Sequence, residues 1–215
     1  MATPLRIDFV SDVSCPWCAI GLNGLQQALQ NLDGEVQAEL HFQPFELNPQ
    51  MAPEGEDVLE HLARKYGSTP EQAAGNQEAI RARGASVGFT FNMGERRRIY
   101  NTFDAHRLLY WAEQEGRQAE LKHALFKAYF TDGKDPSDHA VLTALVAEVG
   151  LDADRAAQIL GSDEFADDVR NQEQFFLRNG INSVPAVIIN QRHLIQGGQP
   201  PEVFEQALRQ IAAQA

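Results

Sequence analysis

The hydrophobic pattern of the first fifty residues predicts a strand, a helix and a second strand. Residues 5–10 (LRIDFV) form a short apolar run that is typical of a buried strand. Leucines then recur at helical spacing from Leu22 to Leu29, and we expect this helix to end near Gly34. Residues 36–42 (VQAELHF) alternate apolar and polar positions, as in an edge strand with one face in water. In a right-handed β-α-β unit, the second strand pairs parallel to the first.

A long middle segment has a helical period instead. From about residue 52 to residue 179 nearly every stretch carries this period, and we find no comparable strand signal there. We expect the apolar faces of these helices to consist of Val58, Leu59, Leu62 and Tyr66; Ile99, Phe103, His106 and Tyr110; Leu121, Leu125 and Tyr129; Val141, Leu142, Leu145 and Val149; and Phe165, Val169 and Phe176.

Strand signals return near the end of the chain. Within residues 184–195, two short apolar runs flank a turn and predict a β-hairpin. Pro200 and Pro201 then open a last helix. The apolar face of this helix consists of Val203, Phe204, Leu208 and Ile211.

The order of these elements is β-α-β, a helical block and then β-β-α. This order is typical of an α/β thioredoxin-like fold interrupted by a large all-helical insert. We assign residues 1–49 and 180–215 to the thioredoxin-like core and residues 50–179 to the insert.

Composition and charge narrow the class of protein. The 215 residues include 43% hydrophobic and 22% charged residues, which is ordinary for a globular chain, and the net charge is −12. Such an acidic balance argues against nucleic acid and anionic membranes as partners. No apolar run approaches the roughly 18 residues of a membrane span, and residues 1–13 lack the pattern of a secretory signal. We therefore expect a cytoplasmic protein.

The chain has two cysteines, Cys15 and Cys18, in a C-x-x-C motif. A structural zinc site needs four ligands, and the six histidines contain no H-x₃₋₅-H pair, so we expect no metal site. A structural disulfide that closes so short a loop adds little stability. A redox-active dithiol remains, as expected for a C-x-x-C near a β-α-β pattern.

The dithiol lies where the first strand passes into the first helix. Ser14 is a natural N-cap, and Pro16 fits the first helical turn. Cys15 is thereby placed at the helix N-terminus, where the helix dipole and free N–H groups stabilise a thiolate. Cys18 lies one turn deeper. Two incidental cysteines are the alternative interpretation.

Several separated motifs resemble one known family. They read SDVSCPWCAIG around Cys15, PFELNP from Pro44 to Pro49, NTFDAHRL from Asn101 to Leu108, and INSVPAVIIN followed by IQGGQP near the end. In this order the chain resembles the DsbA-like thioredoxin-fold family, in its cytoplasmic FrnE (polyketide-isomerase-type) branch. The resemblance implies thiol–disulfide oxidoreductase or isomerase activity on thiol- or disulfide-containing protein clients.

The same superfamily branch leaves a second function open. It includes 2-hydroxychromene-2-carboxylate isomerase and kappa-class glutathione transferase, which bind glutathione and typically carry Ser where this chain has Cys15. The presence of both cysteines favours redox chemistry, while glutathione stays open as a redox partner or co-substrate. A client-binding module with a secondary dithiol is a third class. The client, the electron donor and the choice between monomer and homodimer stay open.

Position and resemblance together suggest roles around the dithiol. We expect Cys15 to be the nucleophile and Cys18 the resolving thiol. Pro16 and Trp17 flank the site and influence its potential, although Trp17 is also consistent with plain hydrophobic cover.

The second part of the expected site lies near the C-terminal hairpin. The resemblance implies that Pro185 is cis and lies against the dithiol, the alternative being a trans proline at a strand edge. The backbone of Val184 can then pair with an extended substrate peptide.

Three further positions are open to two interpretations. His106 is either an ordinary buried histidine or lines the pocket facing Cys15, where with Asn101 it binds a carboxylate or stabilises the thiolate. Asn48 is a similar candidate, or simply a turn residue before Pro49. The basic run at residues 96–98 suggests an anionic ligand or else a solvated loop paired with nearby acids.

Overall fold

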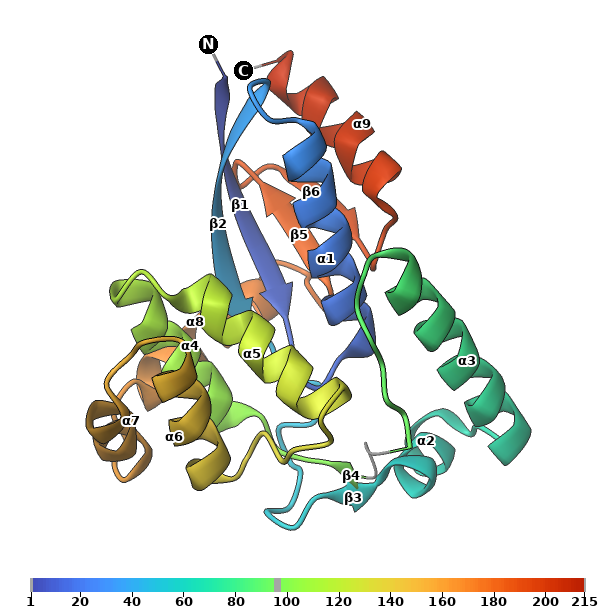
Figure 1. Ribbon diagram of the computed structural model, residues 1–215, viewed down its shortest axis with the longest axis vertical. Helices are drawn as coiled ribbons and strands as arrows, with labels where there is room; N and C mark the ends of the chain where they lie inside the picture. The colour runs from blue at the N-terminus through green and yellow to red at the C-terminus, as the bar shows by residue number, and fades with distance from the viewer. Residues whose placement is uncertain (1, 95–97, 215) are drawn as a thin grey trace.

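The computed structural model describes residues 2–94 and 98–214, and a four-stranded sheet forms its centre (Figure 1). The strand order is β2-β1-β5-β6. The bounds are Thr3–Ser11 for β1, Val36–Pro44 for β2, Ala186–Ile189 for β5 and His193–Gln196 for β6. Strand β1 pairs parallel to β2 and antiparallel to β5, and β5 and β6 form the expected hairpin. The predicted β-α-β unit and hairpin are therefore confirmed.

Different helices pack on the two faces of the sheet. On β1, Leu5, Ile7 and Phe9 point into a core shared with helices α1 (Pro16–Asn31) and α9 (Pro201–Ala212). The alternate positions Arg6 and Asp8 face the side on which helix α8 (Ala166–Arg178) lies. Helix α1 ends three residues before the predicted Gly34, which instead turns the chain with a φ of 80°.

Helices dominate the middle of the chain, as predicted. Their bounds are Val58–Tyr66 for α2, Pro70–Ser86 for α3, Phe103–Gln114 for α4, Gln118–Phe130 for α5, His139–Glu148 for α6 and Ala153–Leu160 for α7. Figure 1 shows α4 to α8 gathered on one side of the dithiol end of the sheet and α2 and α3 on the other.

A small strand pair in this segment was not predicted. Strand β3 (Glu56–Asp57) pairs antiparallel with β4 (Arg98–Ile99), and Ile99 therefore lies in a strand and not on a helical face. Two-residue strands are too short to produce an alternating pattern, so they leave no signal in the sequence.

Helix α5 joins the insert to the sheet core. Phe126 and Phe130 of α5 belong to the same buried cluster as Cys18 and the apolar residues of β1. A second cluster is formed within α4 to α7, around Leu108, Leu121 and Leu142. The division of the chain at residues 49 and 179 stays a prediction.

Some predicted inward positions are exposed. Leu59 is 51% exposed and Tyr66 is 60% exposed, because α2 packs through Val58 and His61 instead. Val203, expected on the inner face of α9, is 41% exposed.

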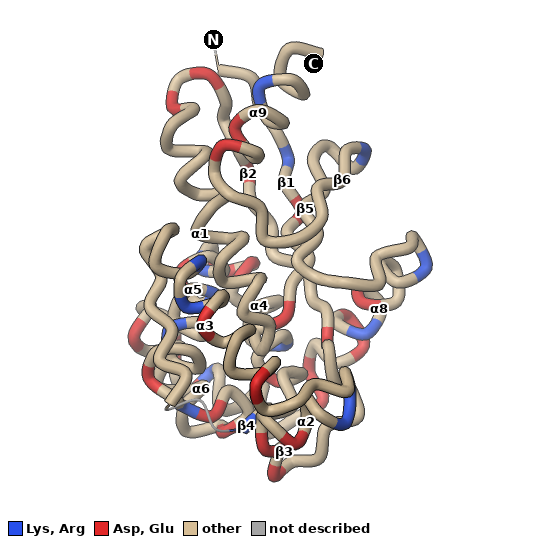
Figure 2. The backbone as a smooth tube through the Cα atoms, turned by 90° about the vertical axis from the view of Figure 1, so that its right-hand side faces the viewer, with Lys and Arg blue, Asp and Glu red and all other residues tan. Residues whose placement is uncertain are grey.

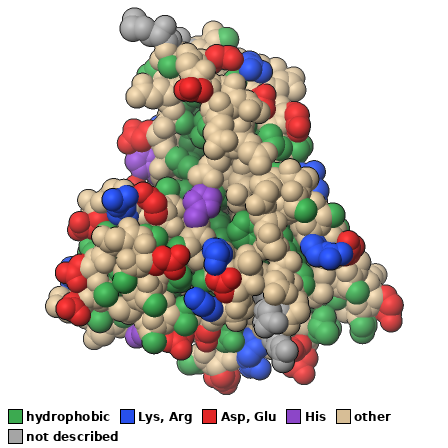
Figure 3. Space-filling model, viewed as in Figure 1, with side chains coloured by type: hydrophobic (Ala, Val, Ile, Leu, Met, Phe, Trp, Pro, Cys, Tyr) green, Lys and Arg blue, Asp and Glu red, His purple; other side chains and the backbone are tan. Residues whose placement is uncertain are grey.

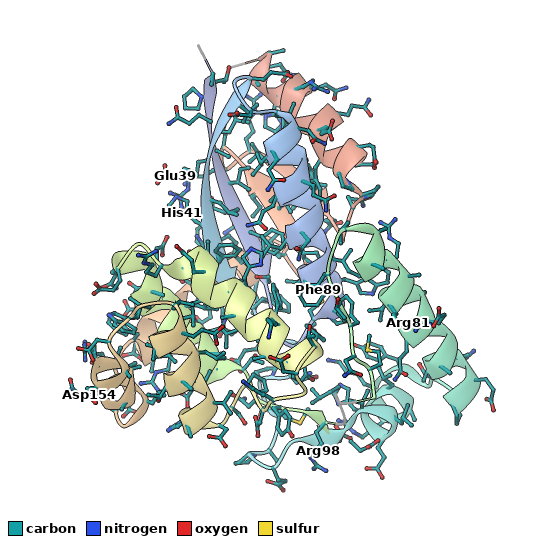
Figure 4. The ribbon with its side chains drawn as sticks, viewed as in Figure 1. Glu39, His41, Arg81, Phe89, Arg98 and Asp154 are labelled. Carbon is teal, nitrogen blue, oxygen red and sulfur yellow. The ribbon has the colours of Figure 1, made fainter. Side chains whose placement is uncertain are left out.

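Polar contacts also attach the insert to the edge strand. His41 of β2 lies 3.1 Å from Glu39 and, through Nδ1, 2.7 Å from Glu113 of α4. Figure 4 shows Glu39 and His41 on the outer side of β2.

Acidic and basic residues are interspersed along the chain and over the surface (Figures 2 and 3). Arg98 donates hydrogen bonds to the carbonyl oxygens of Glu54 and Gly55, at 2.9 and 3.0 Å. Arg96 and Arg97 lie outside the described residues, so an anionic ligand at this run stays a prediction. Within the described ranges, no helix is both long and apolar enough to cross a membrane.

Candidate active site

Cys15 is the residue at which the loop after β1 becomes helix α1. It occupies the N-cap position with an extended backbone, and Pro16 follows as the first helical residue. Ser14 was predicted as the N-cap, and this is wrong by one residue. Its hydroxyl instead donates to the carboxylate of Asp12 at 2.9 Å and does not cap the helix.

The two cysteines are free thiols with different access to solvent. Cys15 is 5% exposed and Cys18 is fully buried. Burial, together with the neighbouring Cys15, raises the pKa of Cys18 well above its usual range. A reagent that approaches the site therefore meets Cys15 first, at the end of α1 where unpaired N–H groups stabilise negative charge.

The loop before β5 lies directly against Cys15. Its sulfur lies 3.7 Å from the carbonyl oxygen of Val184, and the Val184–Pro185 peptide bond is cis, which excludes the trans alternative. Pro185 packs on α1 beside Gly21, where an added Cβ would lie 3.1 Å from the proline ring. Val184 and Pro185 are thereby brought together with the dithiol.

Two aromatic side chains flank this arrangement. Trp17 is 39% exposed, and its backbone packs against Gly198. Burial and then the charge of Cys15 raise the pKa of Tyr66, so this side chain lies within electrostatic range of Cys15. The helical period predicts Tyr66 on an inner face, so the sequence pattern does not indicate it as a site residue.

Asp12 organises the loop behind the dithiol and was not predicted. Its buried carboxylate accepts hydrogen bonds from the N–H groups of Ser14 and Leu47, at 3.2 and 2.7 Å. Asn48, the next residue after Leu47, accepts a hydrogen bond from Lys65 at 2.8 Å, and its carbonyl group closes a turn with the N–H of Met51. An acidic residue three positions before a C-x-x-C was the available signal.

Asn101 and His106 lie at the start of α4. The side-chain oxygen of Asn101 accepts the N–H of Phe103 at 2.9 Å, and its amide donates to Glu46 at 3.3 Å. His106 is buried, with Nε2 3.5 Å from Asp12. The structure therefore connects His106 to the dithiol loop through Asp12. Ligand binding by Asn101 and His106 stays a prediction.

A buried lysine is the most unexpected member of the site. Lys122 of α5 is fully buried, and with His106 it lines a small cavity. The ionisable groups that interact with it electrostatically are Cys18, Asp12 and Cys15. Its signal in the sequence is a lysine beside the apolar face of the predicted helix with Leu121 and Leu125.

The part of the chain that the structure describes contains no group of three or more His, Cys, Asp or Glu side chains arranged to hold a metal ion. The chemistry of the described site is that of two thiols, a buried carboxylate, a histidine and an amine.

A family model described as a DSBA-like thioredoxin domain matches residues 6–209. A probable DsbA oxidoreductase of Streptomyces coelicolor is 32% identical in sequence, with a TM-score of 0.92 over 98% of this chain and 91% of that chain.

Two more distant structures share the fold. The cytosolic disulfide reductase DsbM of Pseudomonas aeruginosa, solved with GSH, is 17% identical, with a TM-score of 0.65 over 97% of this chain and 99% of that chain. A 2-hydroxychromene-2-carboxylate isomerase is 13% identical, with a TM-score of 0.73 over 97% of both chains. The fold predicted from the sequence is confirmed by these matches.

Proposed function

Because the chain belongs to the family of DSBA-like thioredoxin domains, we propose that it is an enzyme that catalyses thiol–disulfide exchange through Cys15 and Cys18. One observation carries this proposal. A thiol that is 5% exposed lies at a helix N-terminus and 3.7 Å from the Val184 carbonyl, while a second thiol is fully buried one turn deeper. This geometry separates the two steps that exchange requires.

In the reducing direction the steps are as follows. The Cys15 thiolate attacks one sulfur of a substrate disulfide, and the other substrate sulfur leaves as a thiolate. Cys18 loses its proton and attacks the Cys15 sulfur, which releases the second substrate thiolate. The substrate disulfide gains two electrons, and the two cysteines lose them in forming the Cys15–Cys18 disulfide. Oxidation or isomerisation of a client uses the same steps in other orders.

The surroundings of Cys15 support a cysteine-containing peptide segment as substrate. The half-buried Val184 presents backbone groups beside the reactive sulfur, so an extended segment can pair with it like a short strand. Trp17 and Tyr66 add exposed aromatic surface on which such a segment can pack. Protein clients and glutathione both meet this description, and the DsbM structure contains GSH. A reducing cytoplasmic setting and glutathione as the electron donor are part of the proposal.

Insulin reduction in the presence of glutathione tests the proposal. Wild type should precipitate insulin faster than glutathione alone, and Cys15→Ser should abolish the difference. Cys18→Ala should accumulate a mixed disulfide on Cys15, which intact mass identifies. The chain has no third cysteine, so that adduct can form at one position only.

The same variants distinguish thiol–disulfide exchange from the alternative, a glutathione-dependent isomerase or transferase. A glutathione-dependent isomerase or transferase needs one activating group at position 15 and does not need Cys18. Isomerase turnover that survives in Cys18→Ala, without insulin reduction by wild type, would therefore replace the proposal by that class.

A further inference from the structure

Lys122 is a buried cation without a hydrogen-bond partner among the described residues. The side chain is 0% exposed, in the middle of α5, and Nζ lies 5.0 Å from the centre of the Phe126 ring. Taking an ammonium group out of water is costly unless other groups compensate. A hydrophobic side chain would fill the same position without this cost, so the amine needs an explanation.

The groups around Lys122 belong to the dithiol site. The ionisable groups that interact with it electrostatically are, in decreasing order, Cys18, Asp12 and Cys15. Lys122 also lines a small cavity with His106, about large enough for one water molecule. The titratable groups that face Lys122 from the loop before α1, from α1, from α4 and from its own helix are Asp12, Cys15, Cys18, His106, Tyr110 and His123.

Cys18 has no access to bulk water through which it could lose a proton. It is fully buried and belongs to the same apolar cluster as Phe126 and Phe130, and the polar groups that act on it are the Cys15 side chain, the backbone of Asp12 and Lys122. Exchange nevertheless requires that Cys18 attack as a thiolate. A base inside the protein is therefore needed behind the resolving cysteine.

We propose that Lys122 is this base, so that its neutral amine accepts the proton of Cys18 when Cys18 attacks the mixed disulfide on Cys15. The inference rests on the proposed exchange chemistry and adds a residue to it. A general base acts at hydrogen-bond distance or through one water, so the transfer requires that the four-carbon side chain rotate toward Cys18 or that one water molecule bridge the two groups.

The step balances in atoms and electrons. The Cys18 S–H bond breaks and an N–H bond forms on Lys122, which becomes an ammonium ion. The Cys18 sulfur forms a bond with the Cys15 sulfur, and the bond between Cys15 and the substrate breaks. The substrate sulfur leaves with the electron pair as a thiolate and then takes up a proton from Lys122 or from water.

The protonation of Lys122 is suited to this task. Burial lowers the pKa of Lys122 to about 8, although the nearby thiols and Asp12 oppose the change. An exposed lysine, with a pKa of about 10.4, would remain almost fully charged near neutral pH. At pH 7 roughly a tenth of Lys122 is therefore neutral, whereas far less than a hundredth of a surface lysine is.

The reaction of the reduced protein with 5,5′-dithiobis(2-nitrobenzoate) isolates this step. Cys15 attacks the reagent and releases one coloured thiolate in a phase whose rate depends on reagent concentration. Cys18 then releases the second in an intramolecular phase, which stopped-flow absorbance resolves. Lys122→Met replaces the amine by an apolar side chain of similar length, and Lys127→Met is the matched control, because Lys127 is on the same helix with a side chain that is 61% exposed.

At pH 7 we expect Lys122→Met to slow the second phase at least about tenfold while the first phase stays within about twofold. Between pH 6 and 9 the second phase of wild type should rise and then level off, whereas that of Lys122→Met should continue to rise with hydroxide. In Lys122→Ala, added methylamine should restore the second phase, while Lys127→Met should behave as wild type.

Two outcomes overturn the inference. One is a second phase in Lys122→Met within about twofold of wild type. The other is a slow second phase in Lys122→Ala that methylamine does not restore, which would mean that the lysine only supports the packing. If wild type itself releases one thiolate and no second, the proposed role of Cys18 fails, and the inference fails with it.

Discussion

The Asp12 carboxylate lies 3.5 Å from Nε2 of His106, and each of the two side chains is only 1% exposed. The same carboxylate accepts the N–H of Leu47. A single side chain in the loop before Cys15 therefore joins that loop to helix α4 and to the segment after β2.

This arrangement predicts a stability that depends on pH. Burial by itself would raise the pKa of Asp12, but the nearby imidazole of His106 and the N–H of Leu47 bring it below the ordinary value of 3.8. Because the folded-state pKa is lower than the unfolded one, ionised Asp12 stabilises the fold above about pH 4, and this contribution is lost as the pH falls through the folded-state pKa. Asp12→Asn should therefore reduce the change in free energy of unfolding between pH 5 and pH 3.

Urea titrations at these two pH values measure this change. Asp33→Asn, at an exposed turn, is the control and should keep the wild-type dependence. A steep acid dependence that persists unchanged in Asp12→Asn would contradict the assignment.

Glu173 should make the stability of the fold depend on pH in the opposite direction. Burial and the negative charge of Glu46 raise the pKa of Glu173 to about 7, although Arg170 lies 2.9 Å away. The folded protein therefore holds a proton that the unfolded chain releases at lower pH, and stability is lost as the pH rises from about 4.5 to about 7. Glu173→Gln should stabilise the fold at pH 8, by on the order of 1–3 kcal/mol, and change it little at pH 4.

Melting temperatures of Glu173→Gln and of the exposed control Glu78→Gln, at both pH values, test this prediction. Glu78 pairs with Arg81 at the surface and should change stability by less than about 1 kcal/mol. Equal effects of the Glu173 substitution at pH 4 and pH 8 would show that burial does not shift its titration.

The two thiols should differ in reactivity. At pH 7, iodoacetamide should modify Cys15 first and Cys18 at least about 100-fold more slowly, because Cys18 is fully buried and burial raises its pKa. Mass spectrometry during the reaction should show one adduct, and Cys15→Ser should react very slowly. Both cysteines should react in urea, which serves as the control. Comparable labelling of the two in the native protein would reverse the assigned roles.

Gly198 should tolerate no side chain. A Cβ at this position would lie 2.8 Å from the backbone oxygen of Trp17, so the C-x-x-C turn would have to move. We expect Gly198→Ala to cost about 1–3 kcal/mol of stability and to slow thiol exchange. Gly75→Ala is the matched control, since Gly75 lies within α3 with open space around it, and this change should stabilise by about 0.5–1 kcal/mol. Equal effects of the two substitutions would contradict the close packing on Trp17.

The sheet could be predicted because its signals are local. Each strand pattern can be recognised within a few consecutive residues, as in the apolar run at residues 5–10, the alternation at residues 36–42 and the C-terminal hairpin. The dithiol position followed from them, since a C-x-x-C between a strand and a helix has one place in such a unit.

The remaining parts of the site depend on contacts across the fold. Ser14 has a side chain typical of an N-cap, but its hydroxyl donates a hydrogen bond to Asp12. The N-cap position is occupied by Cys15 instead. Tyr66 fits an inner apolar period, but α2 packs through another face, so this side chain is 60% exposed and lies within electrostatic range of Cys15. Lys122 differs in the opposite way from Tyr66, because it is a polar side chain that is fully buried. The packing of α5 on the sheet core buries it, and this packing cannot be read from the polarity of the residue.

The central place of β1 affects how the protein is made. Its Ile7 lies opposite Leu40 of β2 and opposite Ile189 of β5. A ribosome delivers the first partner soon after β1, but the second emerges only with the last thirty or so residues, and pairing over such a separation is slow. Cys15 is therefore synthesised long before the Val184–Pro185 loop that lies against it. During translation its sulfur lacks the cover of that loop, so the fold limits access to Cys15 only after β5 has paired with β1.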